Sequence, residues 1–144
     1  MHTSRLPVRN AVTGAVLALC LIQSACRLVD PHDPNDISLG VRNAGYIAGQ
    51  FATLTIANQS GRTIGFNLCF ATLERSEGGE WVPIVPDDTC TDEMYVLVHG
   101  ERATYDYLLD SSIPSGTYRF VYTFAPTGNE ELTLVTNRFD IDQP

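Results

Sequence analysis

Four cysteines are the residues of this sequence best suited to covalent chemistry: Cys20, Cys26, Cys69 and Cys90. A catalytic thiolate works with a neighbouring base, yet the chain of 144 residues holds only three histidines. A structural zinc site needs further ligands at tight spacing, and none accompany these cysteines. We therefore expect neither a catalytic cysteine nor a metal ligand among them, which leaves attachment and cross-linking as their roles.

Other catalytic residue types do not form a known motif either. A nucleophile elbow, a P-loop, an HExxH helix and an EF-hand loop are all absent from the sequence. The chain has no lysine, which removes Schiff-base chemistry. Its serines stand in turn-like segments, and His99 precedes Gly100 as a turn residue would. The sequence therefore predicts no catalytic residue, no cofactor and no small-molecule substrate.

Acidic residues are the second kind of candidate. One loop carries Asp87, Asp88, Asp92 and Glu93, whose oxygens could hold a hard cation such as calcium. We favour solvated loop carboxylates over a cation site there, and a flexible linker over a metal site around His32. The net charge of −8, from 17 acidic and 9 basic residues, argues against a nucleic-acid partner.

The N-terminus carries a targeting pattern. Arg5 and Arg9 form a positive region, residues 11–22 form a mostly apolar run of 12, and small residues follow at 24–25. This is the pattern of a secretory signal peptide, and the run is too short for a membrane-spanning helix, which needs roughly 20 residues. We therefore expect residues 1–25 to be removed on export. Removal deletes two arginines and no acids, so the net charge becomes 7 − 17 = −10.

Cys26 directly follows the small residues, and this arrangement resembles the lipobox of bacterial lipoproteins. The resemblance implies cleavage before Cys26 and acylation of that cysteine, with the membrane as a partner through the lipid anchor. Leucine is usual at the position of Gln23, and cleavage of an ordinary secretory signal is the alternative. Residues 26–36 hold two prolines and three aspartates, so we expect a flexible linker. The localisation that follows is the cell envelope.

Export places the two remaining cysteines in an oxidising compartment. Cys20 leaves with the signal peptide and Cys26 is assigned to the lipid, so Cys69 and Cys90 are expected to form a disulfide. The loop that they close spans 90 − 69 = 21 positions. Since Cys69 alternates with apolar neighbours, we expect the disulfide on the outer or edge side of its strand.

Alternating apolar and polar residues from Ile37 onward predict short strands with turns between them. The expected strands are 37–41, 51–58, 63–74, 81–85, 94–98, 102–109, 116–124 and 132–141. Strand 63–74 is expected to bury Phe70, and Pro83 marks its own strand as an edge. Seven to eight strands in residues 37–144 fit an antiparallel β-sandwich, with a closed barrel as the alternative.

The segment PSGTYRF, residues 114–120, has the spacing Gly-x-Tyr-x-Phe at the start of an alternating strand. It resembles the tyrosine corner of immunoglobulin-like domains, which implies a buried Tyr118 whose hydroxyl bonds to upstream backbone. Gly116 belongs to the turn that delivers this tyrosine. Phe120 stands where immunoglobulin domains place an inter-sheet cysteine, and we expect it to face the core.

Further motifs extend this resemblance over about residues 51–141. With LTIANQSGRTIGF, WVPI and a closing FDI, the chain resembles the small bacterial immunoglobulin-like domains of cell-envelope proteins. This implies an all-β, immunoglobulin-like sandwich that binds an envelope protein or has a structural role, without catalytic residues. Trp81 is expected to pack on the sheet, with an exposed binding anchor as the alternative. A proteinase inhibitor of similar fold is the second hypothesis, its candidate reactive segment lying inside the cysteine pair.

Overall fold

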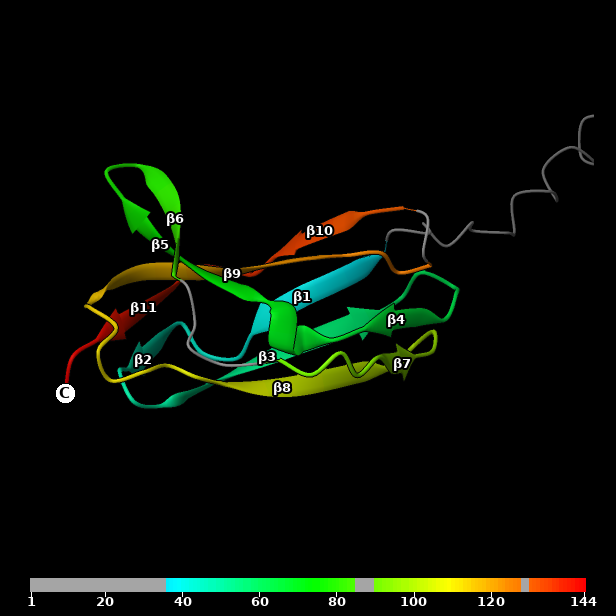
Figure 1. The fold of residues 1–144 in the computed structure, drawn as a ribbon, viewed down its shortest axis with the longest axis horizontal. Helices are drawn as coiled ribbons and strands as arrows, with labels where there is room; N and C mark the ends of the chain where they lie inside the picture. The colour runs from blue at the N-terminus through cyan, green and yellow to red at the C-terminus, as the bar shows by residue number, and fades with distance from the viewer. Residues whose placement is uncertain (1–35, 85–89, 128–129) are drawn as a thin grey trace, which may run out of the picture. The chain divides into compact units, whose positions relative to one another are not determined.

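The computed structural model describes residues 36–84, 90–127 and 130–144, all within one compact unit of the chain, His32–Pro144. Strands make up nearly all of the regular structure in these ranges (Figure 1). The elements are β1 (Ile37–Val41), β2 (Gly45–Ile47), β3 (Phe51–Asn58), β4 (Ile64–Phe66), the 3-10 helix η1 (Leu68–Phe70), β5 (Thr72–Glu77), β6 (Glu80–Ile84), β7 (Tyr95–Leu97), β8 (Arg102–Leu108), β9 (Gly116–Phe124), β10 (Leu132–Val135) and β11 (Phe139–Asp142).

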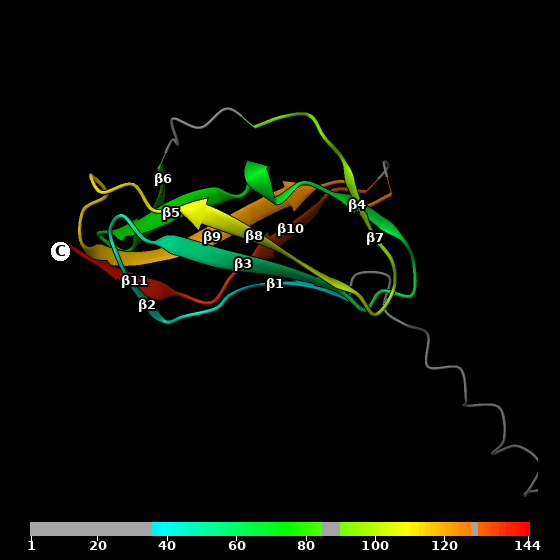
Figure 2. The ribbon, with the colours of Figure 1, turned by 90° about the horizontal axis from the view of Figure 1, so that it is seen from below.

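These strands form a β-sandwich. One layer is the three-stranded sheet β1-β3-β8, and the other has the order β2-β11-β9-β5-β6, with β10 also paired to β9. Strands β4 and β7 form a two-stranded sheet at one end of the sandwich (Figure 2). All pairings are antiparallel except that of β2 with β11. The predicted all-β fold is therefore confirmed.

The core lies between the two larger sheets. Ala52, Leu54 and Ile56 alternate along β3 and are fully buried, because a strand places every second side chain on the same face. Phe120 of the facing sheet is also fully buried, as expected. Its ring lies 4.9 Å from that of Tyr107 on β8, in an edge-to-face contact that joins the two layers.

The predicted strand 63–74 is wrong in its middle. It divides into β4, η1 and β5, and Phe70 is 51 % exposed instead of buried. The cause is Asn67, whose side-chain oxygen accepts a hydrogen bond from the Cys69 backbone N–H at 3.0 Å and so caps η1. The chain thereby passes from the β4–β7 sheet into the larger sheet, while Leu68 stays buried.

The predicted strand 132–141 is also divided, into β10 and β11. Val135 pairs with Val121, and Phe139 pairs with Tyr118. Between these two pairs, the chain from β10 to β11 has one residue more than β9, and this extra residue divides the predicted strand. Strand β2 was not predicted, because three residues give too little alternation. The described residues thus hold strands β1 to β11, more than the seven or eight expected.

Candidate binding site

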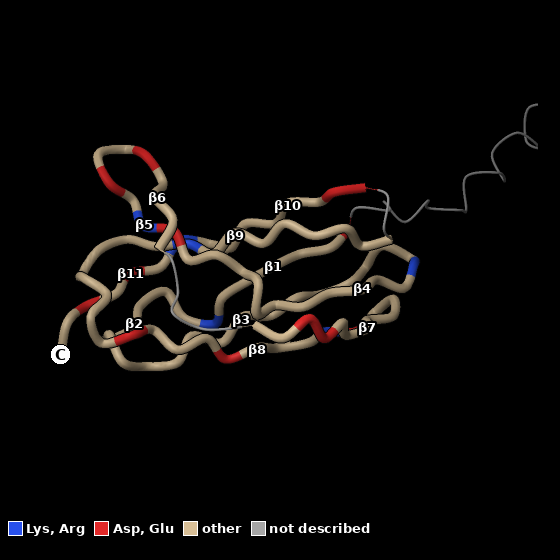
Figure 3. The backbone as a smooth tube through the Cα atoms, in the orientation of Figure 1, with Lys and Arg blue, Asp and Glu red and all other residues tan. Residues whose placement is uncertain are grey.

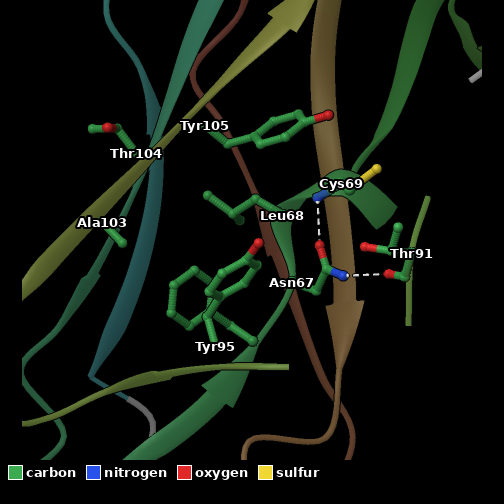
Figure 4. A pocket seen from close by; sticks show the side chains of 9 residues that line it. Asn67, Leu68, Cys69, Thr91, Tyr95, Ala103, Thr104 and Tyr105 are labelled. Atoms are coloured by element: carbon green, nitrogen blue, oxygen red, sulfur yellow. Dashed lines mark hydrogen bonds between the residues drawn. The ribbon is translucent and has the colours of Figure 1, made fainter. Parts of the chain in front are cut away.

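A pocket of about 460 Å³ opens between β8 and the segment that follows β4 (Figure 4). Its walls come from three parts of the chain that are distant in sequence. The lining residues are Phe66, Asn67, Leu68, Cys69, Thr91, Tyr95, Ala103, Thr104 and Tyr105. They combine apolar and aromatic side chains with a few hydroxyl and amide groups, which is the composition of a binding pocket.

Asn67 holds one wall of this pocket together. Its amide nitrogen donates to the carbonyls of Thr91 and Glu93, at 2.9 and 2.8 Å, while its amide oxygen accepts from the Cys69 N–H. Its backbone N–H donates to the Tyr122 hydroxyl at 2.8 Å. Asn67 is buried, so losing any of these bonds would leave a polar group unpaired away from water. This network fixes the segment before β7 against η1.

The disulfide Cys69–Cys90 is present, with the two Cα atoms 5.7 Å apart, which confirms the predicted pairing. Both cysteines are partly exposed, so the bridge lies away from the core. Cys69 belongs to η1 and not to the long strand expected around it. The bridge and the Asn67 network therefore hold the same two segments together at the rim of the pocket.

Tyr95 supplies a polar group at the mouth of the pocket. Its hydroxyl donates to Glu93 Oε2 at 3.0 Å, and this hydrogen bond, together with the carboxylate charge, raises the pKa of the Tyr95 hydroxyl. The Tyr95 ring lies 5.9 Å from that of Phe66, between centroids. A neutral phenol beside an aromatic wall combines a polar group with an apolar surface.

Exposed apolar side chains gather on the other side of Asn67. Phe70, Met94, Val96 and Val98 are 51, 67, 66 and 44 % exposed, and we call these four residues the apolar patch. We call residues 94–98, which contain β7, the β7 segment. Met94, Val96 and Val98 occupy alternate positions along it, so they share one face. Phe70 and Met94 both line a second pocket, of about 410 Å³. Phe70 of η1 and Met94 just before β7 therefore meet around one pocket.

Tyr118 is fully buried, and its hydroxyl donates a hydrogen bond to the backbone carbonyl of Pro114, as the tyrosine-corner resemblance implies. Gly116 leaves room for Arg75, since a Cβ at Gly116 would lie 3.0 Å from Arg75 Nε. Arg75 Nη2 donates to the carbonyl of Ser115 at 3.0 Å. These contacts order the turn before β9 and give Tyr118 and Gly116 structural roles.

Trp81 is partly exposed and stands between two arginines on the outer face of the six-stranded sheet. The guanidinium carbon of Arg119 lies 4.2 Å from the ring centroid, and that of Arg138 lies 5.4 Å from it. Arg119 also donates to Glu74 at 2.7 Å. Trp81 therefore packs on the sheet against charged side chains. This is the arrangement that was expected, in preference to an exposed binding anchor.

Several predicted sites lie outside the described residues. These are Cys26 with the signal peptide and most of the linker, and Asp87 and Asp88 of the acidic loop. Further acidic residues, Asp92 and Glu93, are exposed just before β7 (Figure 3). Within the described ranges, no group of three or more His, Cys, Asp or Glu side chains could hold a metal ion. The same ranges contain no helix with the length and apolarity to cross a membrane.

Sequence reasoning missed the two buried asparagines, Asn67 and Asn58. The Asn58 amide nitrogen donates to the carbonyls of Arg62 and Leu97, at 2.7 and 3.0 Å, and its oxygen accepts from the Ser60 hydroxyl at 2.6 Å. This network fastens the turn after β3 to β7. A signal for Asn58 was present, because it continues the inward-facing alternation of β3. Asn67 gave no such signal.

Comparison with known proteins supports the fold directly. No curated protein matches the chain. The family model of the bacterial Ig-like domain matches residues 33–140, a range that includes β1 to β10 and the start of β11. A domain of this kind indicates a structural or protein-binding role. With most of its length matched, the chain belongs to the bacterial Ig-like domain family.

Proposed function

We propose that this protein is a non-enzymatic lipoprotein of the cell envelope, anchored through Cys26, whose Ig-like domain binds another envelope protein. The apolar patch is the observation that carries the binding role. Soluble monomers rarely expose large contiguous apolar surfaces without a function for them. Here four apolar side chains stand out from η1 and the β7 segment, beside a pocket that a partner's side chain can enter.

The surroundings of the patch favour a protein as the ligand. Phe70 and Met94 flank an open pocket whose other walls include Phe124 and the acidic residues Asp92 and Glu93. Apolar surface rimmed by charge is typical of protein interfaces, in which the centre is desolvated and the rim stays wet. The Asn67 network already holds η1 and the β7 segment in place. Binding a partner would therefore immobilise few additional groups and cost little conformational entropy.

The anchoring part of the proposal rests on the sequence. An apolar run ends in Ser24-Ala25-Cys26, and the residues that follow have the composition of a solvated linker. An acylated cysteine with more than one chain gives stable membrane attachment. Such an anchor would keep the domain at the membrane surface, where a partner in the same envelope is within reach.

The proteinase-inhibitor hypothesis gains no support from the described residues. Most of the segment between Cys69 and Cys90 forms β5 and β6, which pair with each other over five positions within the larger sheet. The reactive loop of an inhibitor has to enter the protease as an exposed, extended segment that is not paired within its own sheet. The β5–β6 hairpin is instead committed to the sheet, because β5 also pairs with β9.

Two experiments test the two parts of the proposal. Labelled palmitate fed to expressing bacteria should enter the wild-type protein and not Cys26→Ala; equal labelling of both would refute the anchor. For the patch, Val96→Glu should lose a partner that wild-type protein captures from envelope extract. The matched control is Val135→Glu, an exposed valine on β10 that is 45 % exposed and outside the patch. Equal capture by both variants would refute the role of the patch.

A further inference from the structure

Strand β8 is an open sheet edge. It pairs with β3 on one side only, and among the described strands it ends the order β1-β3-β8. Figure 1 shows β8 along the lower border of the sandwich, and Figure 2, seen from below, shows it in front of the strands that it covers. A seven-residue strand in this position presents unpaired backbone groups to any strand that approaches.

The register tells which residues of β8 point their backbone groups outward. The Asn58 N–H donates to the Glu101 carbonyl, and the Leu109 N–H donates to the Gln50 carbonyl, so odd-numbered residues of β8 face β3. Arg102, Thr104 and Asp106 therefore direct their N–H and C=O groups away from β3. Within the described residues, no backbone hydrogen bond outside the β3–β8 ladder involves these three residues.

The three other end strands of the two larger sheets, β6, β2 and β1, are each protected in some way. Strand β6 contains Pro83, which cannot donate to a further strand, and its edge position confirms the sequence prediction. Strand β2 has only three residues. The Val41 N–H of β1 donates to the Asn137 side chain at 3.2 Å, which closes part of that edge. Strand β8 contains no proline, and the pocket of about 460 Å³ separates Ala103, Thr104 and Tyr105 from η1. In the described residues, no side chain bonds to the outward backbone groups of Arg102, Thr104 and Asp106, so β8 differs from these three edges.

The side chains of β8 are complementary to a second β8 strand. In an antiparallel pair centred on Thr104, Arg102 lies opposite the partner's Asp106, and Asp106 lies opposite the partner's Arg102. The same register sets Ala103 opposite the partner's Tyr105, a small residue against a large one. Arg102 is exposed, and it forms no ion pair among the described residues. Asp106 is exposed too and uses one oxygen to accept from Thr53 at 2.7 Å, which leaves the other available.

We propose that two copies of this protein associate through antiparallel pairing of their β8 strands around Thr104. The two three-stranded sheets then form one continuous sheet, with a two-fold axis through the Thr104 pair. This arrangement satisfies the outward backbone groups and makes two cross-strand ion pairs on one face and two Ala103–Tyr105 contacts on the other. The inference goes beyond the proposed function and does not depend on the apolar patch or the anchor.

Charge exchange tests the register. The full chain is used with Cys26→Ser, so that lipid cannot bring two copies into one detergent micelle, and its mass is followed by sedimentation velocity over a range of concentrations. The parent should form dimers. Arg102→Asp sets aspartate opposite aspartate at both pairs, and Asp106→Arg sets arginine opposite arginine. Each single change should weaken dimerisation at least about tenfold, since both cross-strand pairs turn from attraction to repulsion.

Mixing the two single variants provides the decisive result. In a mixed dimer, one pair joins the new aspartate at position 102 to the new arginine at position 106, and the other joins the native Asp106 to the native Arg102. An equimolar mixture should therefore recover dimers, as should the double exchange in one chain. Recovery also shows that the variants are folded. The matched control is Arg42→Asp, an exposed arginine just after β1, which should dimerise like the parent. A monomeric parent, or single variants that dimerise normally, or a mixture that stays monomeric, would overturn the proposal.

Discussion

Three tyrosines can test whether a hydrogen bond contributes more to stability when it is more deeply buried. The Tyr122 hydroxyl accepts the backbone N–H of Asn67 in the protein interior. The Tyr118 hydroxyl donates to the carbonyl of Pro114 in a partly buried setting. Among the described residues, the hydroxyl of Tyr105 has no hydrogen-bond partner. Replacing each tyrosine with phenylalanine removes one oxygen atom and leaves the ring, so the three changes are matched.

The structure predicts unequal losses. An unpaired buried polar group costs about 1–3 kcal/mol in the free energy of unfolding. Tyr122→Phe leaves the Asn67 N–H unpaired away from water, so we expect a loss of about 2–3 kcal/mol. Tyr118→Phe leaves a carbonyl oxygen that water can reach in part, and we expect about 1 kcal/mol. Tyr105→Phe should change the free energy by less than about 0.5 kcal/mol.

Urea unfolding of the full chain, followed by circular dichroism, measures these differences. With a slope of about 1.5 kcal/mol per molar urea, the midpoints should fall by about 1.3–2 M for Tyr122→Phe and about 0.7 M for Tyr118→Phe. Equal shifts for these two variants would refute the argument from burial. An unchanged midpoint for Tyr118→Phe, with loss of the partner captured through the apolar patch, would refute the tyrosine-corner interpretation.

Other predictions concern the core, the disulfide and alkaline pH. Phe120→Ala should lower the free energy of unfolding by about 3–5 kcal/mol in the same assay, because it leaves a cavity between the sheets. Replacing Cys69 and Cys90 with serine should cost about 3 kcal/mol and leave the native circular dichroism spectrum unchanged, since the bridge is off the core. Burial raises the pKa of the Tyr118 and Tyr122 hydroxyls, so the stability that they contribute is complete below the unfolded pKa of about 10 and is lost as pH rises through the raised values. Urea midpoints should therefore fall above pH 10, and less so when both are phenylalanine.

Regular alternation made much of the fold predictable. Strands β3 and β9 lie where the sequence placed them, because their inward residues are apolar at every second position and pack against each other. The disulfide also followed from counting the cysteines left once Cys20 was assigned to an expected signal peptide and Cys26 to an expected lipid anchor. These features depend on local pattern or on counting, both of which a single sequence shows.

The candidate site depended on contacts that no local pattern shows. The break after β4 is caused by a hydrogen bond from Cys69 to the Asn67 side chain, which alternation treats as an ordinary outward residue. That break turns Phe70 outward and so supplies one of the four residues of the apolar patch. The pocket beside β8 is assembled from residues of three separate segments, and their proximity follows only from the packing of η1 and the β4–β7 sheet beside β8.

Trp81 is the only tryptophan of the chain, and its place on β6 gives the protein an internal fluorescent reporter. The aromatic residues of the core are tyrosines and phenylalanines, so tryptophan emission reports only on the surroundings of β6, at the edge of the six-stranded sheet. Trp81 also lies within the sequence enclosed by the disulfide. A shift of its emission to longer wavelength on reduction, before the circular dichroism signal of the strands is lost, would mean that β6 separates from β5 while the core is still folded.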